Sequence, residues 1–377
     1  MKILIDAQSI VENRTGVGRY TLNLLLAMAQ LKNPHEYIPV YFNFRRRFKE
    51  QFLWEKYSSI RPCEIRCVPG FVMHRLWRYF SFLPLDYFSG RADVVLFPNY
   101  TIEPLSSGKT VMTVHDLCFL RFPDTLMPKN LRRLKRAFEK SLSSSDAVLT
   151  VSEFSRSEFF HYYPSYQKPV VVTPNGIDEF LGFIPDEEQQ KRVKLTHSLP
   201  EDFLLYVGAV EPRKNLILLL KAFSILRKKY PDLKLVMAGT KGWLSGEFHE
   251  TVHQLDLKEW ILFPGFISDE DLKLIYSLAK LFVFPSIYEG FGLPPLEAMA
   301  CGAPVLASSI PVHREILGNA ACFCSPDASP HEWAETISRI ISSTETVSDM
   351  VQKGRTTAAA FTWKKTAELT LNLFEKL

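Results

Sequence analysis

Residues 280–308 read KLFVFPSIYEGFGLPPLEAMACGAPVLAS, and their pattern is that of one structural unit. The short apolar runs at the two ends, KLFVFPS and APVLAS, are typical of buried strands. Between them, we expect Pro294 to be the start of a helix and Gly302 to be the position just after it ends. A strand, a helix and a second strand in this order form the βαβ unit of a parallel sheet.

The same alternation of strands and helices extends over the rest of the chain. In the first half we expect strands within residues 2–7, 37–44, 64–69, 93–99, 109–116, 146–152 and 169–176, and helices within 17–31, 129–143 and 153–161. In the second half we expect strands within 202–209, 233–239, 260–266, 280–286, 303–308 and 321–326, and helices near 215–229, 269–279 and 294–301. The sequence therefore predicts an α/β fold with two doubly wound, Rossmann-like domains in tandem.

A polar stretch, residues 185–200, separates the two halves of this pattern. We place the first domain at residues 1–180 and the second at 190–360, in agreement with a length of 377 residues. A last helix within 362–377 has an apolar face, so it must pack on one of the two domains, and packing back on the first is one option. That face consists of Leu369, Leu373 and Phe374.

The composition is that of a globular protein, with 46% hydrophobic and 23% charged residues. The six cysteines are scattered, with no C-x-x-C and no histidine pair at zinc spacing, which argues against a disulfide framework and a zinc ribbon. The first residues, MKILIDAQSI, reach Asp6 too early for a signal peptide, and no 18 apolar residues occur in a row. We therefore expect a cytoplasmic protein.

The basic residues are concentrated in the first half of the chain. Residues 1–178 carry 24 Lys and Arg against 16 Asp and Glu, a net +8, so the total of +4 leaves −4 for the rest. Cations and large aromatic residues mix within 74–83 and within 44–54, which contains Arg45, Arg46, Arg47 and Lys49. Such segments suit peripheral contact with an anionic membrane, on its inner face for a cytoplasmic protein; core aromatics beside solvated arginines are the alternative. Nucleic acid is not expected as a partner, because no recognisable module for it is present.

In open α/β sheets, ligands bind beyond the carboxyl ends of the strands, where loops lead into helices. The first such turn is RTGVGRY, residues 14–20, in which Gly16 and Gly18 permit a positive φ or the close approach of a ligand. The turn lacks the spacing G-x-G-x-x-G, and no G-x-x-x-x-G-K-[ST] occurs, so neither a dinucleotide site nor a P-loop is indicated. A structural turn and an anion-binding turn both remain open.

The corresponding turn of the second half contains Arg213 and Lys214. Two adjacent cations at a helix start are unfavourable against the helix dipole unless an anionic ligand binds there. Arg213 would then bind a diphosphate as a fork, and Lys214 would bind it as a point charge. A solvated pair of side chains is the alternative.

Two acids, Glu289 and Glu297, lie in the stretch quoted first. We expect Glu289 in a loop beside glycines and Glu297 in the first helical turn, where the helix dipole alone favours an acid. Their spacing within EGFGLPPLEAMACGAPV resembles the E-x7-E signature of retaining glycosyltransferases of GT-B fold (family 4, group 1), which use nucleotide sugars. The stretches TGVGRYTLNLL, TVHDL, TPNGID and VGAVEPRKNL extend this resemblance over nearly the whole chain.

The resemblance implies two Rossmann-like domains whose parallel sheets face each other across a cleft, with the acceptor on the side of the first domain. It implies that Arg213 and Lys214 hold the diphosphate of a nucleotide-sugar donor. From the first domain, it places Gly16 against the phosphates and His115 near the transferred sugar. His115 follows an apolar strand, so a satisfied core imidazole is the alternative reading of its position.

The resemblance also implies how the donor's two sugars are held. Glu297 would hydrogen-bond the ribose, and Glu289 would bind the transferred hexose. The backbone of Phe291 and Gly292 would hold the same hexose, and Leu293 belongs to the same donor-binding set. Retaining members are expected to work by front-face substitution, in which the departing phosphate helps to deprotonate the acceptor hydroxyl.

Neither a metal nor a cofactor is expected. A diphosphate leaving group gains negative charge as the glycosidic bond breaks, and two fixed cations with helix N-termini stabilise that charge. The one D-x-D, at Asp269-Glu270-Asp271, follows Ser268 at the spacing of a helix capping box, which favours a helix start over a metal site.

The wording of TVHDL and EPRKN is most similar to bacterial members that transfer mannose from GDP-mannose. We therefore expect a hexosyl group, mannosyl in particular, to pass to a glycan or lipid-linked acceptor in polysaccharide or lipopolysaccharide biosynthesis. A hexosyltransferase that uses a UDP-sugar, a nucleotide-sugar epimerase and a nucleotide-sugar-binding protein without turnover remain the alternatives.

Overall fold

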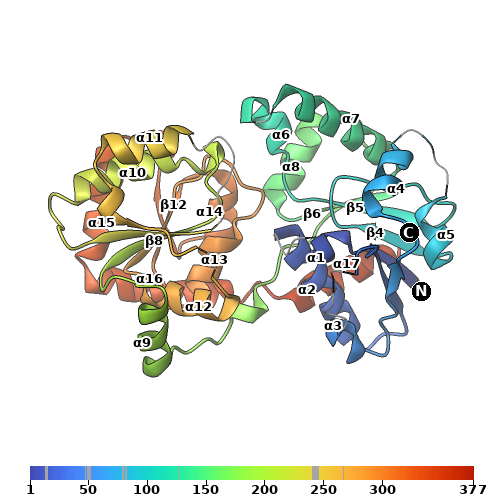
Figure 1. The fold of residues 1–377 in the computed structure, drawn as a ribbon, viewed down its shortest axis with the longest axis horizontal. Coiled ribbons are helices and arrows are strands. Elements are labelled where there is room, and N and C mark those ends of the chain that lie inside the picture. Colours follow the sequence, from blue (N-terminus) through green and yellow to red (C-terminus); the bar gives the residue numbers. More distant parts are fainter. Residues whose placement is uncertain are drawn as a thin grey trace. The chain divides into compact units, whose positions relative to one another are not determined.

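The computed structural model describes residues 1–12, 16–46, 48, 52–78, 80, 83–125, 127–239, 246–265 and 267–377. These residues form two compact units: Met1–Gly176 together with Thr362–Leu377, and Ile177–Phe361. Each unit contains a parallel sheet with helices on both of its faces (Figure 1). The predicted α/β fold with two Rossmann-like sheets is confirmed.

The sheet of the first unit has seven strands in the order β3-β2-β1-β4-β5-β6-β7. They are β1 (Lys2–Asp6), β2 (Glu36–Phe42), β3 (Cys63–Ile65), β4 (Val94–Phe97), β5 (Lys109–Val114), β6 (Ala147–Thr150) and β7 (Val170–Val172). The helices are α1 (Gln8–Glu12), α2 (Gly16–Gln30), α3 (Phe52–Glu55), α4 (Gly70–Trp77), α5 (Leu85–Ser89), α6 (Cys118–Arg121), α7 (Pro128–Ser144), α8 (Glu153–Tyr162) and α17 (Trp363–Phe374), with a 3₁₀ turn η1 (Pro123–Thr125). Each strand overlaps a predicted one, although β3 is only three residues long and ends before most of the range expected for it.

The side chains of β1 alternate between two cores. Ile3 and Ile5 pack in a cluster with residues of α2 and α17, whereas Leu4 packs in a second cluster with residues of α4 and α7. All three are buried. Because both faces of the sheet are covered, its strands are apolar on both sides, which is why the sequence shows continuous apolar runs.

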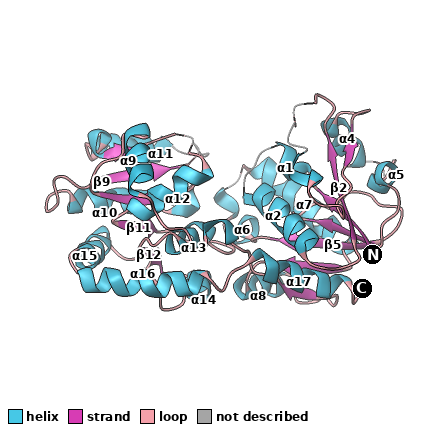
Figure 2. Ribbon diagram, turned by 90° about the horizontal axis from the view of Figure 1, so that it is seen from below, coloured by secondary structure: helices cyan, strands magenta, loops and turns pink. Residues whose placement is uncertain are grey.

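The last helix, α17, packs on α2 within the first unit (Figure 1, Figure 2). Its Trp363 meets the ring of Tyr20 edge-on, with centroids 5.8 Å apart, and Leu371 and Leu373 are buried. A Cβ on Gly176 would lie 2.2 Å from the backbone nitrogen of Trp363. Glycine is therefore required at this position, because it lets the two backbone segments approach closely.

The sheet of the second unit has six strands in the order β10-β9-β8-β11-β12-β13. They are β8 (Phe203–Val207), β9 (Lys234–Ala238), β10 (Ile261–Leu262), β11 (Leu281–Phe284), β12 (Val305–Ser308) and β13 (Cys322–Cys324). The helices are α9 (Glu187–Thr196), α10 (Leu216–Leu226), α11 (Gly246–Gln254), α12 (Asp269–Leu278), α13 (Leu293–Ala300), α14 (Pro311–Leu317), α15 (Pro330–Ile341) and α16 (Thr344–Ala358), with 3₁₀ turns η2 (Asp178–Phe180), η3 (Pro212–Lys214) and η4 (Lys258–Trp260).

The polar stretch 185–200 contains the helix α9 and belongs to the second unit. Asp186 caps the helix by accepting hydrogen bonds from two backbone N–H groups, and α9 packs on α12. Val193 is its one buried residue, so the helix has too narrow an apolar stripe to be recognised from the sequence. In the part of the chain that the structure describes, no helix is both long and apolar enough to cross a membrane.

Candidate functional site

The second sheet has a topological switch point between β8 and β11. These strands are neighbours at the centre of the sheet, and the strands that follow them in sequence, β9 and β12, lie on opposite sides. The loops that leave β8 and β11 at their carboxyl ends therefore diverge and leave room for a ligand between them. Both sequence motifs of the second half, VGAVEPRKNL and EGFGLPPLE, fall in these two loops.

The loop after β8 carries Arg213 and Lys214 on the 3₁₀ turn η3. Asn215 follows with a φ of 54° as the N-cap of α10, so the two cations precede the α-helix rather than occupy its first turn. Lys214 is only 7% exposed. The solvated pair of cations considered from the sequence is therefore wrong for Lys214.

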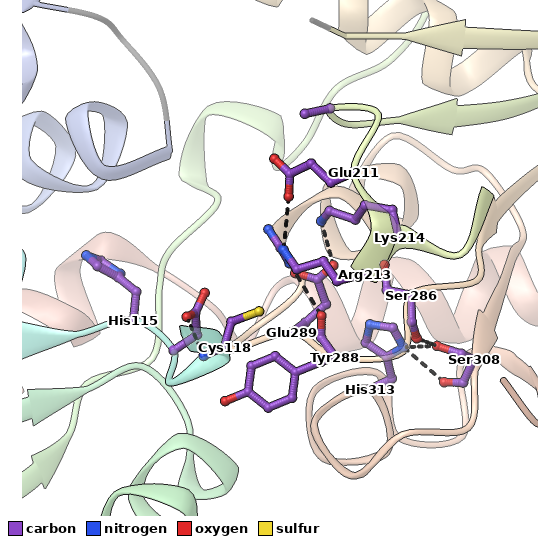
Figure 3. A network of polar contacts seen from close by, with 12 residues as sticks. His115, Cys118, Glu211, Arg213, Lys214, Ser286, Tyr288, Glu289, Ser308 and His313 are labelled. Carbon is purple, nitrogen blue, oxygen red and sulfur yellow. Dashed lines mark hydrogen bonds and ion pairs between the residues drawn. The ribbon is translucent and has the colours of Figure 1, made fainter. Parts of the chain in front are cut away.

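A single carboxylate, Glu289, joins the two cations (Figure 3). Its Oε1 lies 2.5 Å from Nζ of Lys214, and its Oε2 lies 2.7 Å from Nη1 of Arg213. The other side of the guanidinium meets Glu211, with Nε 3.0 Å from a carboxylate oxygen. The backbone N–H of Ile287 also donates to the carbonyl oxygen of Arg213, so the two loops are tied together at this point.

Burial and charge oppose each other in this cluster. Burial alone would raise the pKa of Glu289, but the charges of Arg213 and Lys214 outweigh it and lower that pKa to about 2. Burial lowers the pKa of Lys214, and the charge of Glu289 opposes that effect. A buried ammonium and a buried carboxylate are each costly alone, so each stabilises the charged form of the other.

The loop between Glu289 and α13 contains the residues expected to hold the sugar. Gly292 has a φ of 94°, which favours glycine, and it precedes α13 directly. Phe291 is 5% exposed and packs edge-on against Phe361. Leu293 is the first residue of α13 and Gly292 is its N-cap, so the backbone of Phe291 and Gly292 leads directly into that helix.

Glu297 lies in the second turn of α13, because the helix begins at Leu293. The first-turn position expected from the sequence is therefore wrong, and the helix dipole does not account for this acid. Glu297 is 3% exposed, and the hydroxyl of Tyr276 on α12 donates to its Oε2 at 3.0 Å. This bond holds the Glu297 carboxylate in one orientation, on the helix that directly follows the loop of Glu289.

A histidine that the sequence analysis did not single out lies behind this loop. His313 is completely buried at the start of α14, and the Cβ of an alanine at Gly292 would lie 3.5 Å from its Nε2. Its Nδ1 lies 2.9 Å from the carbonyl oxygen of Ser308, and the Ser308 hydroxyl itself donates to the carbonyl of Ser286 (Figure 3). The Ser308 hydroxyl oxygen also lies 3.2 Å from Nδ1, and its own hydrogen is already donated to Ser286. Both oxygens near Nδ1 are therefore acceptors, so Nδ1 carries the proton. Burial lowers the pKa of His313 to about 4, and the ring is neutral at pH 7.

The remaining two predicted site residues lie in the first unit. Gly16 is the first residue of α2, with open space where a Cβ would be. Arg14 and Thr15, from the same motif, lie outside the described residues. His115 follows β5, and its Nε2 donates to the carbonyl oxygen of Pro98 at 2.8 Å. Burial lowers the pKa of His115, so the ring is neutral.

The structure thus brings seven of the nine predicted residues together in the second unit and leaves Gly16 and His115 in the first. Sequence reasoning missed Glu211, Tyr276 and His313 as neighbours of the site. Glu211 stands two residues before Arg213, so its charge was a usable signal. His313 also follows a strand at the same edge of the sheet, whereas nothing local in the sequence indicates Tyr276.

The acidic run at 269–271 forms the start of α12. Ser268 is its N-cap and accepts a hydrogen bond from the backbone N–H of Asp271. The Asp271 carboxylate binds Arg192 at 2.6 Å and His197 at 2.9 Å. Among the residues that the structure describes, no group of three or more His, Cys, Asp or Glu side chains is arranged to hold a metal ion.

A pocket of about 470 Å³ lies in the first unit beside α4. Its lining consists of Glu12, Phe71, His74, Arg75 and Arg78. His74 lies 2.8 Å from a carboxylate oxygen of Glu103, whose charge and hydrogen bond raise the pKa of this histidine against the effect of burial.

The basic and aromatic segments divide into core and surface residues. Trp54 and Trp77 are buried in the cores, which contradicts a position at a membrane surface for these two rings. Phe44, Phe71 and Phe80 are exposed, by 50%, 70% and 65%. Of the predicted cations, Arg47 and Lys49 lie outside the described residues.

Comparison with known proteins gives matches over both units. The family model "Glycosyltransferase Family 4" matches residues 14–179, and the family model "Glycosyl transferases group 1" matches residues 187–357. The "O-antigen chain mannosyltransferase B" of Escherichia coli is 29% identical, over 100% of both chains. The "Serotype-specific mannosyltransferase WbdA" of Escherichia coli is 31% identical over 78% of this chain, which spans 36% of WbdA's length.

Solved structures agree with these matches at the level of the fold. Sucrose-phosphate synthase from Thermosynechococcus elongatus superposes with a TM-score of 0.75 at 20% identity, over 100% of this chain and 98% of that one. This likeness confirms the GT-B class expected from the sequence. Since one family model matches each half, the chain belongs to the glycosyltransferases of family 4, group 1.

Proposed function

We propose that this glycosyltransferase moves a mannosyl group from GDP-mannose, with retention of configuration, to a glycan or lipid-linked acceptor in lipopolysaccharide O-antigen biosynthesis. The observation that carries the proposal is the pair of a buried Lys214 and a partly buried Arg213 at the switch point of the second sheet. Two relatives named as mannosyltransferases, one of them an O-antigen enzyme matched over its full length, support the choice of sugar and pathway.

The cation pair fits the diphosphate of the donor. The guanidinium of Arg213 offers a planar fork for two phosphate oxygens, and the ammonium of Lys214 is a compact point charge. As the glycosidic bond breaks, the departing diphosphate gains negative charge. Both cations are already held in place by ion pairs, with Lys214 buried and Arg213 partly buried. Preorganised charge of this kind stabilises the transition state more than the ground state.

Glu289, with the backbone of Phe291, Gly292 and Leu293, is proposed to hold the mannosyl group. Gly292 has no side chain, so the sugar can approach its backbone closely, and its positive φ disfavours other residues at this position. Glu297 is proposed to bind the ribose, and its bond from Tyr276 fixes the carboxylate for that contact. Gly16 and His115 of the first unit are proposed to meet the phosphates and the transferred sugar.

Retention is proposed to follow from front-face substitution. The bond from the anomeric carbon to the diphosphate oxygen breaks, and the acceptor oxygen forms its bond to the same face of that carbon. The acceptor's proton passes to the departing phosphate oxygen, so no protein base is needed for this step. Neutral His115 is suited to hydrogen-bond a sugar hydroxyl, and it takes no proton in this scheme.

Catalysis is proposed to require no metal ion. The acids of the D-x-D run belong to a helix start, and Asp271 is paired with Arg192 and His197. Activity is therefore expected to persist in EDTA. Loss of activity in EDTA with recovery on addition of manganese would contradict this part of the proposal.

A transfer assay with isotope-labelled donors tests the function. GDP-mannose is expected to label a lipid-linked O-antigen acceptor, UDP-glucose is not, and NMR of the product is expected to show the donor's anomeric configuration. Label transfer from a UDP-sugar instead would replace the donor. A free epimerised nucleotide sugar, or binding without turnover, would contradict transfer altogether.

Peripheral membrane contact is proposed to use the surface of α4 and the turn after it. This surface, the α4 surface, combines exposed apolar side chains with two arginines: Phe71, Leu76, Phe80, Arg75 and Arg78. Apolar side chains beside cations suit an anionic lipid surface, where a lipid-linked acceptor is held.

Flotation with vesicles containing anionic lipid tests the membrane contact. The chain is expected to float at low salt and less at high salt, because exposed charges are screened. Reversal of Arg75 and Arg78 to Glu is expected to abolish flotation, whereas reversal of the exposed Lys364 and Lys365 on α17 is not. Equal loss in both variants would indicate a dependence on overall charge and would contradict a role of the α4 surface.

A further inference from the structure

Both oxygens of Glu289 are engaged by the cations that the proposed function assigns to the diphosphate. Oε1 binds Lys214 at 2.5 Å, and Oε2 binds Arg213 at 2.7 Å (Figure 3). The side chains of Lys214 and Glu289 are each only 9% exposed, so water contributes little to their solvation. The carboxylate therefore occupies the position, relative to the two cations, that a bridging phosphate would take.

The charges of the cluster balance. Arg213 and Lys214 contribute two positive charges, and Glu211 and Glu289 contribute two negative charges, which leaves a net charge of zero. A diphosphate that approaches a neutral cluster gains less electrostatic energy than one that approaches two unpaired cations. Since a buried ammonium such as that of Lys214 needs a counter-ion at all times, we treat the binding of a diphosphate and the contact with Glu289 as alternatives.

We propose that Glu289 is the internal counter-ion of Arg213 and Lys214, and that the donor's diphosphate replaces it. This inference rests on the donor site proposed above. Once the diphosphate has replaced it, the Glu289 carboxylate turns to the hexosyl group, which the backbone of the following residues up to Leu293 is proposed to hold. When the nucleoside diphosphate leaves after transfer, Glu289 returns to the cations and keeps them paired. The residue thus lowers the affinity for the product and positions the sugar in the same cycle.

If Glu289 only bound the hexose, its replacement would leave the affinity for GDP unchanged, because GDP has no hexose. GDP therefore distinguishes that role from the role of counter-ion. The experiment measures GDP binding by isothermal titration calorimetry to the wild type, to Glu289→Gln and to Glu297→Gln. If Glu289 is the counter-ion, we expect Glu289→Gln to bind GDP more tightly than the wild type, on the order of tenfold. Glu297→Gln serves as the matched control, because it also removes a buried acid of the site, and it is expected to bind GDP more weakly through loss of a ribose contact.

GMP tests whether the gain comes from the diphosphate. Because GMP lacks the second phosphate, Glu289→Gln is expected to gain less affinity for GMP than for GDP. Unchanged or weaker GDP binding by Glu289→Gln would overturn the proposal, and so would an equal gain for GMP and GDP. Stronger product inhibition by GDP in the transfer assay is the expected kinetic counterpart.

Glu289→Gln removes the carboxylate that pairs with the buried Lys214, so its folding is checked by thermal unfolding without nucleotide. If it does not fold, Glu289→Asp takes its place, because a shorter carboxylate keeps the charge but spans the two cations less well. That variant is expected to bind GDP more tightly than the wild type by a smaller factor, and no gain would overturn the proposal.

The same titrations with UDP and ADP separate this inference from the proposed function. Tighter binding of all three diphosphates by the Gln variant, without a preference for guanine in the wild type, would support the counter-ion and contradict GDP-mannose as donor. A guanine preference without any gain in the variant would do the reverse.

Discussion

Lys214 is a cation in an apolar setting, with its ammonium 4.9 Å from the ring centre of Phe284. The proposed diphosphate contact makes it a charge-assisted hydrogen-bond donor, and such a bond contributes about 1.5–3 kcal/mol. Lys214→Met keeps the apolar stem and removes the charge. We expect it to weaken GDP binding and lower kcat/KM, each by roughly ten- to a hundredfold.

Calorimetry and initial-rate kinetics check this prediction. Lys221→Met is the matched control, because it removes an exposed lysine from α10 in the same unit, and it is expected to behave like the wild type. Wild-type GDP affinity in Lys214→Met would show that the buried lysine serves only to stabilise Glu289.

The residues of the donor motifs could be chosen from the sequence because each motif is short and its residues stay close in the fold. The contact between Lys214 and Glu289 could not be predicted, because 75 residues separate them and only the neighbouring positions of β8 and β11 bring the loops together. From the sequence, the two cations are expected to bind phosphate and Glu289 to bind sugar, and nothing local in the sequence indicates that they pair.

Asp6, at the end of β1, makes a testable contribution to stability. Burial raises its pKa from 3.8 to about 6, with further effects from Glu103 and His74. Since the folded pKa is raised, ionised Asp6 destabilises the fold: the effect is absent below pH 4, grows between pH 4 and 6, and is full above pH 6. Asp6→Asn keeps the oxygen that accepts from Gln8. We expect it to stabilise the protein at pH 7, by up to roughly 3 kcal/mol, and to have no effect near pH 4.

Denaturant unfolding of both proteins at pH 4 and pH 7 measures this difference. An equal stability of Asp6→Asn and the wild type at pH 7 would mean that Asp6 is well solvated when ionised.

At the scale of elements, the strands were predictable and several helices were not. Strands buried on both faces need continuous apolar runs, and such runs are visible without knowledge of the fold. Long amphipathic helices such as α2 and α7 were also recognised. The helix α15 was missed although Ser329 and Glu332 form a capping box at its start, so a local signal existed for it.

The start of α13 shows the limit of such signals. Pro294 was taken as the helix start, but Leu293 is its first residue, and that shift moves Glu297 from the first turn to the second. Proline is accepted at the first or second helical position, so it does not fix the start to a single residue.

The contact between Gly176 and α17 predicts a large effect from a small substitution. A Cβ at position 176 would lie within 2.7 Å of three backbone atoms of Thr362 and Trp363. Backbone atoms cannot move aside as side chains do, so Gly176→Ala is expected to displace α17 and to lower the melting temperature markedly. Gly182→Ala is a useful comparison, since its φ of 69° adds strain but its Cβ meets nothing. A larger loss in Gly182→Ala than in Gly176→Ala would contradict the close approach.

At the scale of the whole molecule, the chain leaves the first unit and returns to it at one place. Gly176 touches Thr362 and Trp363 within the first unit, and the N–H of Ile177 donates to the carbonyl of Phe361 at 3.1 Å within the second. The second unit is therefore one continuous segment whose two ends meet. The residues that meet here are nearly 200 positions apart in the sequence, and no local pattern indicates such a contact. The apolar face of the last helix therefore predicted that the helix packs on a domain, but not on which one.

The adjacency of these ends predicts which parts of the chain fold alone. Residues 177–361 contain a complete sheet and both cations proposed for the diphosphate, Arg213 and Lys214, so we expect this segment to fold by itself and to bind GDP. Residues 1–176 lack α17, whose buried side chains each contribute about 1.5–3 kcal/mol, and we expect them not to fold stably. These side chains are Trp363, Leu371, Leu373 and Phe374.

A linked version of the first unit provides the decisive comparison. Because Gly176 already touches Thr362, a short Gly-Ser link can join residues 1–176 directly to 362–377 without strain. We expect cooperative thermal unfolding of this chain by circular dichroism and no cooperative transition for 1–176 alone, because only the linked chain completes the core between α2 and the sheet. Equal stability of the two chains would show that α17 is dispensable. A 177–361 segment that folds but does not bind GDP would show that the first unit supplies nucleotide contacts without which Arg213 and Lys214 do not suffice.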